Sequence, residues 1–203
     1  MSSSPAGGIG VLGSAFNPPH LGHLALAQEA LWQLGLDEVI LVPTGEAPHK
    51  RIADDPGREV RMEMARLAAA EDPRFSVSAL EVEREGPSYT YETLELLAAE
   101  RGDTELVFVM GADAAVGLES WREPRRVVEL ARLAVAGRAG ISEADVAAVL
   151  RSLGAEGRAT MLEMTQFGVS SSAVRERGAA RRPLRYLVPE SVARFIEEKG
   201  IYA

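Results

Sequence analysis

The sequence predicts an α/β protein built on a doubly wound, mainly parallel sheet. Short apolar runs alternate with segments of helical spacing along the 203 residues, and most of the runs are apolar at almost every position, which is typical of strands buried on both faces. The chain contains no internal repeat, no low-complexity block and no evident linker. Because parallel strands are joined by right-handed crossovers, helices should cover both faces of the sheet. We expect a single domain over residues 1–203, in which residues from about 165 to 203 form a small helical part.

Each predicted strand is a short apolar or alternating run between polar segments. The first run, "IGVLG", and the second, "EVILVP", are apolar almost throughout, whereas "RFSVSALEVER" alternates as one or two strands do. The runs "ELVFVMG" and "LAVAG" are again apolar, and "TMLEM" is the last candidate. The predicted strands are therefore residues 9–13, 38–43, 74–84, 105–111, 133–137 and 160–164.

The segments between and after the strands have helical spacing. The first helix should begin near His20 and stop at Gly35, because glycine is a frequent residue at helix ends. A polar loop over residues 44–57 separates the second strand from the second helix. The predicted helices are residues 21–35, 58–71, 89–102, 114–132, 142–154, 169–182 and 189–200.

The composition limits the classes of partner. Acidic side chains outnumber basic ones, 30 to 22, and the formal net charge of -8 argues against a general nucleic-acid or membrane-surface binder. The absence of cysteine excludes disulfides and thiolate metal sites. The start, "MSSSPAGG", has neither a basic nor an apolar leader region, and no run of 18 apolar residues occurs, so we expect a cytoplasmic protein.

The glycines of "GIGVLG" fit the G-x-G-x-x-G pattern of dinucleotide-binding oxidoreductases. In that fingerprint a strand comes first and the glycines form the turn that follows it. Here no segment before Gly8 can supply the strand, and Gly8 and Gly10 fall at or inside the predicted strand itself. The pattern therefore does not indicate a dinucleotide fingerprint.

The two histidines of "HLGH" are the stronger signal. They follow a turn, "GSAFNPPH", whose two prolines hold it outside both neighbouring elements. His20 and His23 are three residues apart at a predicted helix N-terminus, where N–H groups and the helix dipole favour a phosphate. One histidine could instead cap the turn while the other packs, or both could join His49 in a structural zinc site. All three histidines follow the first two strands, and this convergence favours a functional site.

Six segments, taken in order, resemble a known family. "GSAFNPPHLGHL" resembles the G-x-F-x-P-x-H-x-G-H signature of the nucleotidyltransferase superfamily, which adenylylates small phosphate esters. The segments "VPTGEAPHK", "SYTYETL", "GADAAVGLESW" and "VSSSAVR" and the ending "YLVPESVARFIEEKGIY" are similar to bacterial nicotinate-nucleotide adenylyltransferases. The resemblance spans essentially the whole chain and implies a Rossmann-like nucleotidyltransferase fold.

The resemblance implies a reaction with two substrates. The phosphate of nicotinate mononucleotide attacks the α-phosphorus of ATP, with Mg²⁺ bound to the ATP, and gives nicotinate adenine dinucleotide and pyrophosphate. No metal-ligating residues are expected in the chain itself. No covalent intermediate is implied, so the protein would act by positioning the substrates and stabilising charge.

The resemblance also assigns residues to each substrate by matching position. The residues expected to act in catalysis are His20, His23, Lys50 and Arg175. The residues expected on the ATP side are Gly13, Ser14, Phe16, His20, Gly22, His23, Gly111, Asp113, Ser171, Ser172 and Arg175. The residues expected on the nicotinate nucleotide side are Ala15, Asn17, His49, Lys50, Ser88, Tyr89, Thr90, Trp121 and Arg138.

The chain departs from the family pattern in its first loop. Ser14, Ala15 and Asn17 stand where the signature usually has glycine, threonine and aspartate, and "GRAG" replaces a later arginine-proline-glycine. Three alternatives remain open. One is the pantetheine-phosphate branch of the superfamily, the second is nicotinamide mononucleotide as substrate, and the third is a non-catalytic nucleotide-binding module on the same fold.

Overall fold

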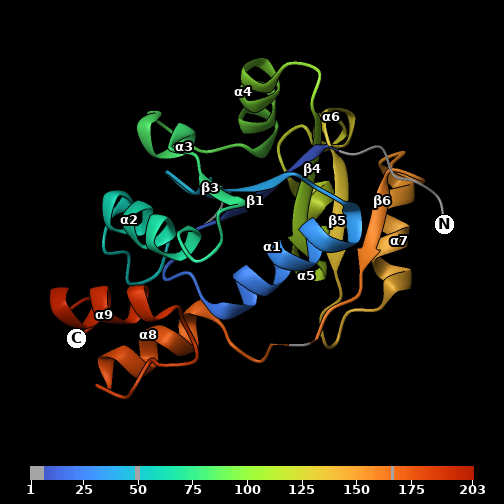
Figure 1. Cartoon of the computed structure of the whole chain (residues 1–203). Coiled ribbons are helices and arrows are strands. Elements are labelled where there is room, and N and C mark those ends of the chain that lie inside the picture. Colours follow the sequence, from blue (N-terminus) through green and yellow to red (C-terminus); the bar gives the residue numbers. More distant parts are fainter. Residues whose placement is uncertain (1–6, 49–50, 166) are drawn as a thin grey trace. The chain divides into compact units, whose positions relative to one another are not determined.

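The computed structural model describes residues 7–48, 51–165 and 167–203. Its strands form one six-stranded sheet in the order β3-β2-β1-β4-β5-β6 (Figure 1). The first three strands are added toward one edge of the sheet and the last three toward the other, so the strand order reverses between β1 and β4. In open α/β sheets of this kind, ligands bind outside the carboxyl ends of the strands at the reversal. The strands are β1 (Gly8–Ser14), β2 (Glu38–Pro43), β3 (Phe75–Val77), β4 (Glu105–Gly111), β5 (Arg132–Ala136) and β6 (Ala159–Leu162).

Helices alternate with these strands from end to end, as expected for a doubly wound fold. The α-helices are α1 (Leu21–Leu34), α2 (Arg58–Ala69), α3 (Leu80–Glu83), α4 (Thr90–Arg101), α5 (Ala112–Val116), α6 (Pro124–Leu130), α7 (Glu143–Ser152), α8 (Ser171–Ala179) and α9 (Glu190–Lys199). A short 3-10 helix, η1, covers Leu118–Ser120.

The chain forms two compact units, and the first comprises residues 1–12, 26–39 and 89–166. Its strands β1, β4, β5 and β6 pair in parallel, with Val11 opposite Phe108 and Gly111 opposite Ala136. The middle residues of β4 and β5 are almost fully buried, which explains why their sequences are apolar throughout. Helices α5 and α6 pack on this part of the sheet.

The second unit comprises residues 13–25, 40–88 and 167–203. Helices α2, α8 and α9 lie together in this unit (Figure 1). They share a core in which Met64, Val174, Val192 and Ile196 are buried. The predicted small helical part contains α8 and α9, and α9 packs against α2. That the whole chain acts as a single domain stays a prediction.

Two predicted elements were wrong in detail. The alternating segment 74–84 is strand only over β3, because the hydroxyl of Ser78 accepts the N–H of Leu80 and begins the helical turn of α3. The single helix predicted over residues 114–132 is instead α5, η1 and α6. Gly117 ends α5, and Pro124 opens α6 at a position that suits proline.

The class of the fold is confirmed. The expected strands correspond to β1, β2, β4, β5 and β6 within one or two residues at each end, and Gly8 and Gly10 lie inside β1, as the rejection of the dinucleotide fingerprint requires. Among the residues that the structure describes, no helix is long and apolar enough to cross a membrane.

Candidate active site

The loop between β1 and α1 places both histidines at the start of a helix. The carbonyl of His20 accepts the N–H groups of His23 and Leu24, so α1 begins directly after His20, close to the start that the sequence predicted. The N–H of Leu21 is bonded to the carbonyl of Leu187, which lies in the "YLVP" ending. The ending therefore has a physical role, because it anchors the first turn of α1.

The two imidazoles stack, and the backbone fixes the tautomer of one of them. The ring centroids of His20 and His23 are 3.8 Å apart, and the edge of the buried Phe16 ring packs against His23. The N–H of His20 donates to Nδ1 of His23 at 3.1 Å, so in the neutral ring the proton lies on Nε2. Nε2 is 3.3 Å from the hydroxyl of Ser14, and it therefore donates to that oxygen.

His23 is neutral at physiological pH. Burial lowers its pKa well below the usual histidine value, and the nearby charge of a protonated His20 lowers it further. The protonated ring would also place an N–H on Nδ1 facing the N–H of His20. Gly22 helps to hold this arrangement, because a Cβ at that position would lie 3.1 Å from the His20 ring. The result is a neutral hydrogen-bond donor, Nε2–H, in the first turn of α1.

Asn17, which replaces the family's aspartate, is buried and bonded entirely within the protein. Its Nδ2 donates to the carbonyl of Ala53 at 2.7 Å and lies within 3.5 Å of the carbonyl of Asp54, and its Oδ1 accepts the hydroxyl of Tyr202. An aspartate could not donate to those carbonyls. The side chain of Asn17 therefore ties the loop after β1 to residues 53–54 and to the end of the chain.

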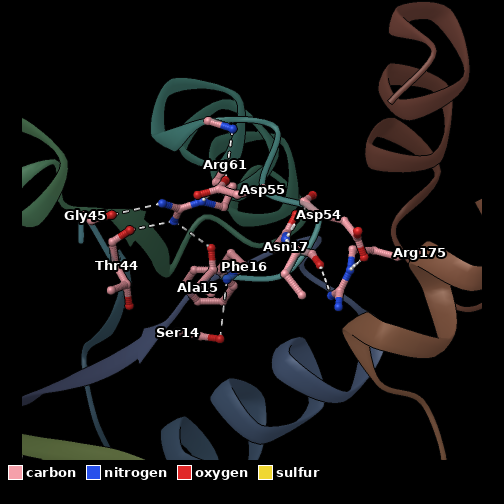
Figure 2. A network of polar contacts seen from close by, with 12 residues as sticks. Ser14, Ala15, Phe16, Asn17, Thr44, Gly45, Asp54, Asp55, Arg61 and Arg175 are labelled. Carbon is pink, nitrogen blue, oxygen red and sulfur yellow. Dashed lines mark hydrogen bonds and ion pairs between the residues drawn. The ribbon is translucent and has the colours of Figure 1, made fainter. Parts of the chain in front are cut away.

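The predicted serine loop lies beside the histidine loop. Ser170 caps α8 by accepting the N–H of Ala173, and the hydroxyl of Ser171 donates to the carbonyl of Pro18 at 2.9 Å. Arg175, one turn further on, donates to the carbonyl of Asn17 and the carboxylate of Asp54 (Figure 2). It also donates to the hydroxyl of Ser172. The structure thus brings the histidines, the serines and Arg175 together within the second unit.

In the first unit, Asp113 and Arg138 form an ion pair with an N–O distance of 3.0 Å, and both side chains are about half exposed. Asp113 lies in α5 directly after β4, and its carboxylate sits where a side chain on Gly111 would be, 2.5 Å from an added Cβ. Glycine at position 111 is therefore needed for this carboxylate to take its place. Arg138 follows β5, so both residues lie at the carboxyl ends of neighbouring parallel strands.

The aromatic residues predicted for the nicotinate side are also in the first unit. The ring of Trp121 is partly exposed and packs its edge against Phe108, with ring centroids 6.0 Å apart. The guanidinium of Arg122 lies over the ring of Tyr89, 5.9 Å from its centroid, and Thr90 begins α4. A partly exposed indole ring can stack on a planar ligand.

Ser88, also predicted for the nicotinate side, is buried, and its polar groups hold the turn after β2. Its hydroxyl accepts the N–H of Gly45 at 3.2 Å, and its own N–H donates to the carbonyl of Glu46 at 2.8 Å. Gly45 is required there, because a Cβ would lie 2.0 Å from the carbonyl oxygen of Glu81. A cavity of about 620 Å³, within the usual size range of small-molecule sites, begins at this turn. Its walls include Gly45, Pro48, Arg51, Asp55, Arg58 and Arg61.

Arg61, which was not predicted from the sequence, is fully buried on α2. The signal was present, because Arg61 lies three and four residues before the buried Met64 and Ala65 and so occupies the apolar face of its helix. A charged residue at such a position needs partners, since burying an unpaired charge is costly. His49 and Lys50, which the sequence assigned to the nicotinate nucleotide, lie outside the described residues.

The described residues contain no group of three or more His, Asp or Glu side chains that could hold a metal ion. The structural zinc site considered for the three histidines required His49, which is not among them. His20 and His23 themselves stack face to face, and a backbone N–H occupies Nδ1 of His23. This arrangement suits contact with a substrate better than joint coordination of an ion.

The sheet order and the H-x-G-H turn at the end of β1 define the class of protein. A family model described as cytidylyltransferase-like matches residues 11–177, from the middle of β1 through most of α8. Solved structures agree with the fold. A nicotinic acid mononucleotide adenylyltransferase of Plasmodium falciparum in complex with NaAD superposes with a TM-score of 0.78 over 98% of each chain, at 13% sequence identity.

Curated sequences narrow the class. A probable nicotinate-nucleotide adenylyltransferase of Roseiflexus sp. (strain RS-1) is 42% identical over 203 residues and covers 100% of both chains. The nicotinate-nucleotide adenylyltransferase of Bacillus subtilis (strain 168) is 36% identical and covers 96% of this chain and 97% of its own. The chain therefore belongs to the nicotinate-nucleotide adenylyltransferase family of cytidylyltransferase-like proteins, as its motifs indicated.

Proposed function

We propose that this protein transfers the adenylyl group of ATP to nicotinate mononucleotide. A phosphate oxygen of the mononucleotide forms a new bond to the α-phosphorus of ATP, and the bond to the bridging oxygen breaks, releasing pyrophosphate and nicotinate adenine dinucleotide. The observation that carries the proposal is the neutral His23, which presents a fixed Nε2–H in the first turn of α1. Full-length identity to family members supports the choice of substrates.

His23 would stabilise the reacting α-phosphoryl group. Negative charge grows on the phosphoryl oxygens during the in-line displacement, and a preorganised donor at that point lowers the barrier. The hydroxyl of Ser14 holds Nε2–H in place until a phosphoryl oxygen replaces it as acceptor. Because Nδ1 already accepts a backbone N–H, the ring cannot rotate or change tautomer without losing that bond.

The leaving pyrophosphate would be held by α8. Nine residues long, α8 presents its first-turn N–H groups beside Ser171 and Ser172, where a helix N-terminus favours phosphate. Arg175 would add its charge, exchanging its contact with the exposed Asp54 for the phosphate oxygens. Magnesium would arrive as part of the ATP substrate, coordinated mainly by phosphate oxygens, as Mg²⁺ is in many nucleotide sites.

The remaining predicted residues would bind the non-reacting parts of the two substrates. In this proposal Asp113 contacts the ribose hydroxyls of the nucleotide, while Trp121 stacks on the pyridine ring and Thr90 donates near its carboxylate. Lys50 and His49 would contact the phosphate of the mononucleotide. A cytoplasmic location belongs to the same proposal.

The test is pyrophosphate release from ATP and Mg²⁺ by the purified protein. Nicotinate mononucleotide, nicotinamide mononucleotide and 4'-phosphopantetheine are offered in separate reactions. We expect kcat/KM with the nicotinate nucleotide to exceed the other two by at least about tenfold, the effect of roughly 1.4 kcal/mol of selectivity. A higher kcat/KM with nicotinamide mononucleotide or with 4'-phosphopantetheine would mean that this compound is the substrate. Release with none of the three would mean that the protein binds nucleotide without catalysis.

A further inference from the structure

Arg61 is a fully buried arginine that no part of the proposed chemistry uses. Its guanidinium makes four hydrogen bonds, and three of them end on backbone carbonyls of loops that follow strands (Figure 2). Nη1 donates to the carbonyls of Ala15 and Thr44, and Nη2 donates to the carbonyl of Gly45 at 3.1 Å. Nε donates to the carboxylate of Asp55 at 2.9 Å.

These partners belong to three separate segments of the second unit. Ala15 is in the loop after β1, Thr44 and Gly45 follow β2, and Asp55 precedes α2. A planar guanidinium with its donors in a rigid fork fixes both the distance and the direction to each acceptor. Arg61 thus sets the spacing between the two strand-end loops and the segment before α2.

Two of the held segments contain or precede residues that the family resemblance assigns to the mononucleotide. Ala15 was predicted for that substrate, and His49 and Lys50 follow Gly45 by four and five residues in the sequence. The same turn forms one wall of the cavity of about 620 Å³, and Arg61 itself lines it. Ser88 holds the turn from its other side.

The phosphate contacts of the ATP side are supported by other bonds. Ser171 is tied to the carbonyl of Pro18, Arg175 to the carbonyl of Asn17, and His23 to the N–H of His20. None of these bonds involves Arg61. Loss of the Arg61 fork should therefore weaken binding of the mononucleotide more than binding of ATP.

We propose that Arg61 is a positioning residue that holds the loops after β1 and β2 in the geometry that binds the mononucleotide. The proposal rests on the proposed function for the identity of that substrate. The removal of the fork would let the turn at Thr44 and Gly45 move, which weakens binding of the mononucleotide and leaves binding of ATP nearly unchanged.

The test is Arg61→Lys, which keeps the positive charge but replaces the fork with a single ammonium group. We expect the KM for nicotinate mononucleotide to rise at least about tenfold, while the KM for ATP changes less than about threefold. The matched control is Arg66→Lys, the same substitution at an exposed position of the same helix, where both KM values should stay as in the wild type. A merely structural role would lower the active fraction, and hence kcat, without this split.

A second readout does not depend on activity. In Arg61→Lys, hydrogen exchange at the N–H groups of Thr44 and Gly45, which bond to Ser14 and Ser88, should be at least about tenfold faster than in the wild type, while exchange in α9 stays unchanged. Unchanged exchange at these two groups, or an equal rise of both KM values, would overturn the positioning role. If wild-type protein turns over no nicotinate mononucleotide, the proposed function fails, and hydrogen exchange still decides whether Arg61 holds the turn.

If Arg61→Lys does not fold, Asp55→Ala decides the question. It leaves the carbonyl bonds of Arg61 in place and removes both the oxygen that accepts the Nε–H and the charge that compensates the guanidinium, so the fork loses its anchor to the segment before α2. We expect the KM for the mononucleotide to rise at least about threefold, with that for ATP unchanged. Unchanged values for both substrates would overturn the proposal.

Discussion

At the scale of single residues, the proposed chemistry depends on one imidazole, His23, whose protonation and orientation are both determined by its surroundings. The sequence placed His20 and His23 on one face at a helix start, which the structure confirms. It did not predict the tautomer, because the N–H that fixes it belongs to the backbone of His20. Nor did it predict that Ser14, a departure from the family pattern, would accept the bond from Nε2.

Replacing His23 should remove most of the catalysis. In His23→Ala we expect kcat to fall at least about 100-fold, the usual loss when one preorganised donor to a developing oxyanion is removed. The KM for ATP should change little, because the contact strengthens only in the transition state. Steady-state pyrophosphate release measures both values, and near-normal turnover would contradict the assigned role.

The lowered pKa of His23 makes stability depend on pH. The unfolded chain takes up a proton near the usual histidine pKa of about 6.5, whereas folded His23 takes it up only at lower pH. The unfolded state therefore binds more protons in between, and the free energy of unfolding should fall as pH drops from about 7 toward 5. Urea unfolding of wild type and His23→Asn at several pH values should give a shallower fall for the variant. An identical slope would refute the lowered pKa.

Trp121 provides the test of substrate recognition in the first unit. In Trp121→Ala, the KM for the nicotinate nucleotide should rise about tenfold while that for ATP stays close to wild type, since a stacked aromatic pair is worth about 0.5–1.5 kcal/mol. Trp32→Ala is the control, because Trp32 is 82% exposed on α1 and no role is assigned to it. Equal changes for both substrates would make Trp121 a packing residue.

At the scale of elements, the turn after β2 is constrained by three contacts. Ser88 and Arg61 both bond to it, and it passes so close to the carbonyl of Glu81 that only glycine fits at position 45. This constraint could not be predicted from the sequence, because Gly45 is one of 19 glycines and its neighbour Glu81 is 36 residues away.

Gly45→Ala should therefore destabilise the fold. The added Cβ would lie 2.0 Å from the oxygen and 2.8 Å from the carbon of the Glu81 carbonyl, so the backbone must shift, which typically costs about 1–3 kcal/mol. At about 2–4 °C per kcal/mol for a chain of this size, thermal unfolding should detect the change. Gly168→Ala is the control, because nothing lies within 4 Å of a Cβ there. Equal melting temperatures for the two variants would contradict the close approach.

At the scale of the whole molecule, the C-terminal segment contacts the loop after β1 within the second unit. Tyr202, in the second-last position, donates its hydroxyl to Asn17, and burial raises the pKa of that hydroxyl. Leu187 bonds to the first turn of α1, and α9 packs on α2. The C-terminal segment thus supports the loop that carries the histidines.

Tyr202→Phe should lower the stability of the protein by about 1–3 kcal/mol, because Oδ1 of the buried Asn17 would lose its donor. The expected fall in melting temperature is several degrees. Tyr186→Phe is the control, since Tyr186 is 78% exposed. Equal melting temperatures for the two variants would mean that the Asn17 contact adds nothing to stability.

The sequence by itself determined the α/β class, the family, the five main strands and the placement of His20, His23, Ser171 and Arg175 near strand and helix ends. These features depend on local periodicity and on motifs that are contiguous in the chain, so they are visible without coordinates. The interruption of the predicted helix between Gly117 and Pro124 also has a local cause. It was not predicted, because the apolar residues on either side of it have helical spacing.

Only the tertiary structure decided the tautomer of His23, the buried fork of Arg61, the requirement for Gly45 and the bond between Asn17 and Tyr202. Three of these four depend on pairs of residues from 16 to 185 positions apart in the chain. Hydrogen-bond geometry and close packing act over a few ångströms in space, whatever the separation along the chain. The residues proposed to contact the substrates were therefore predictable from motifs, whereas the bonds that hold them in place were not.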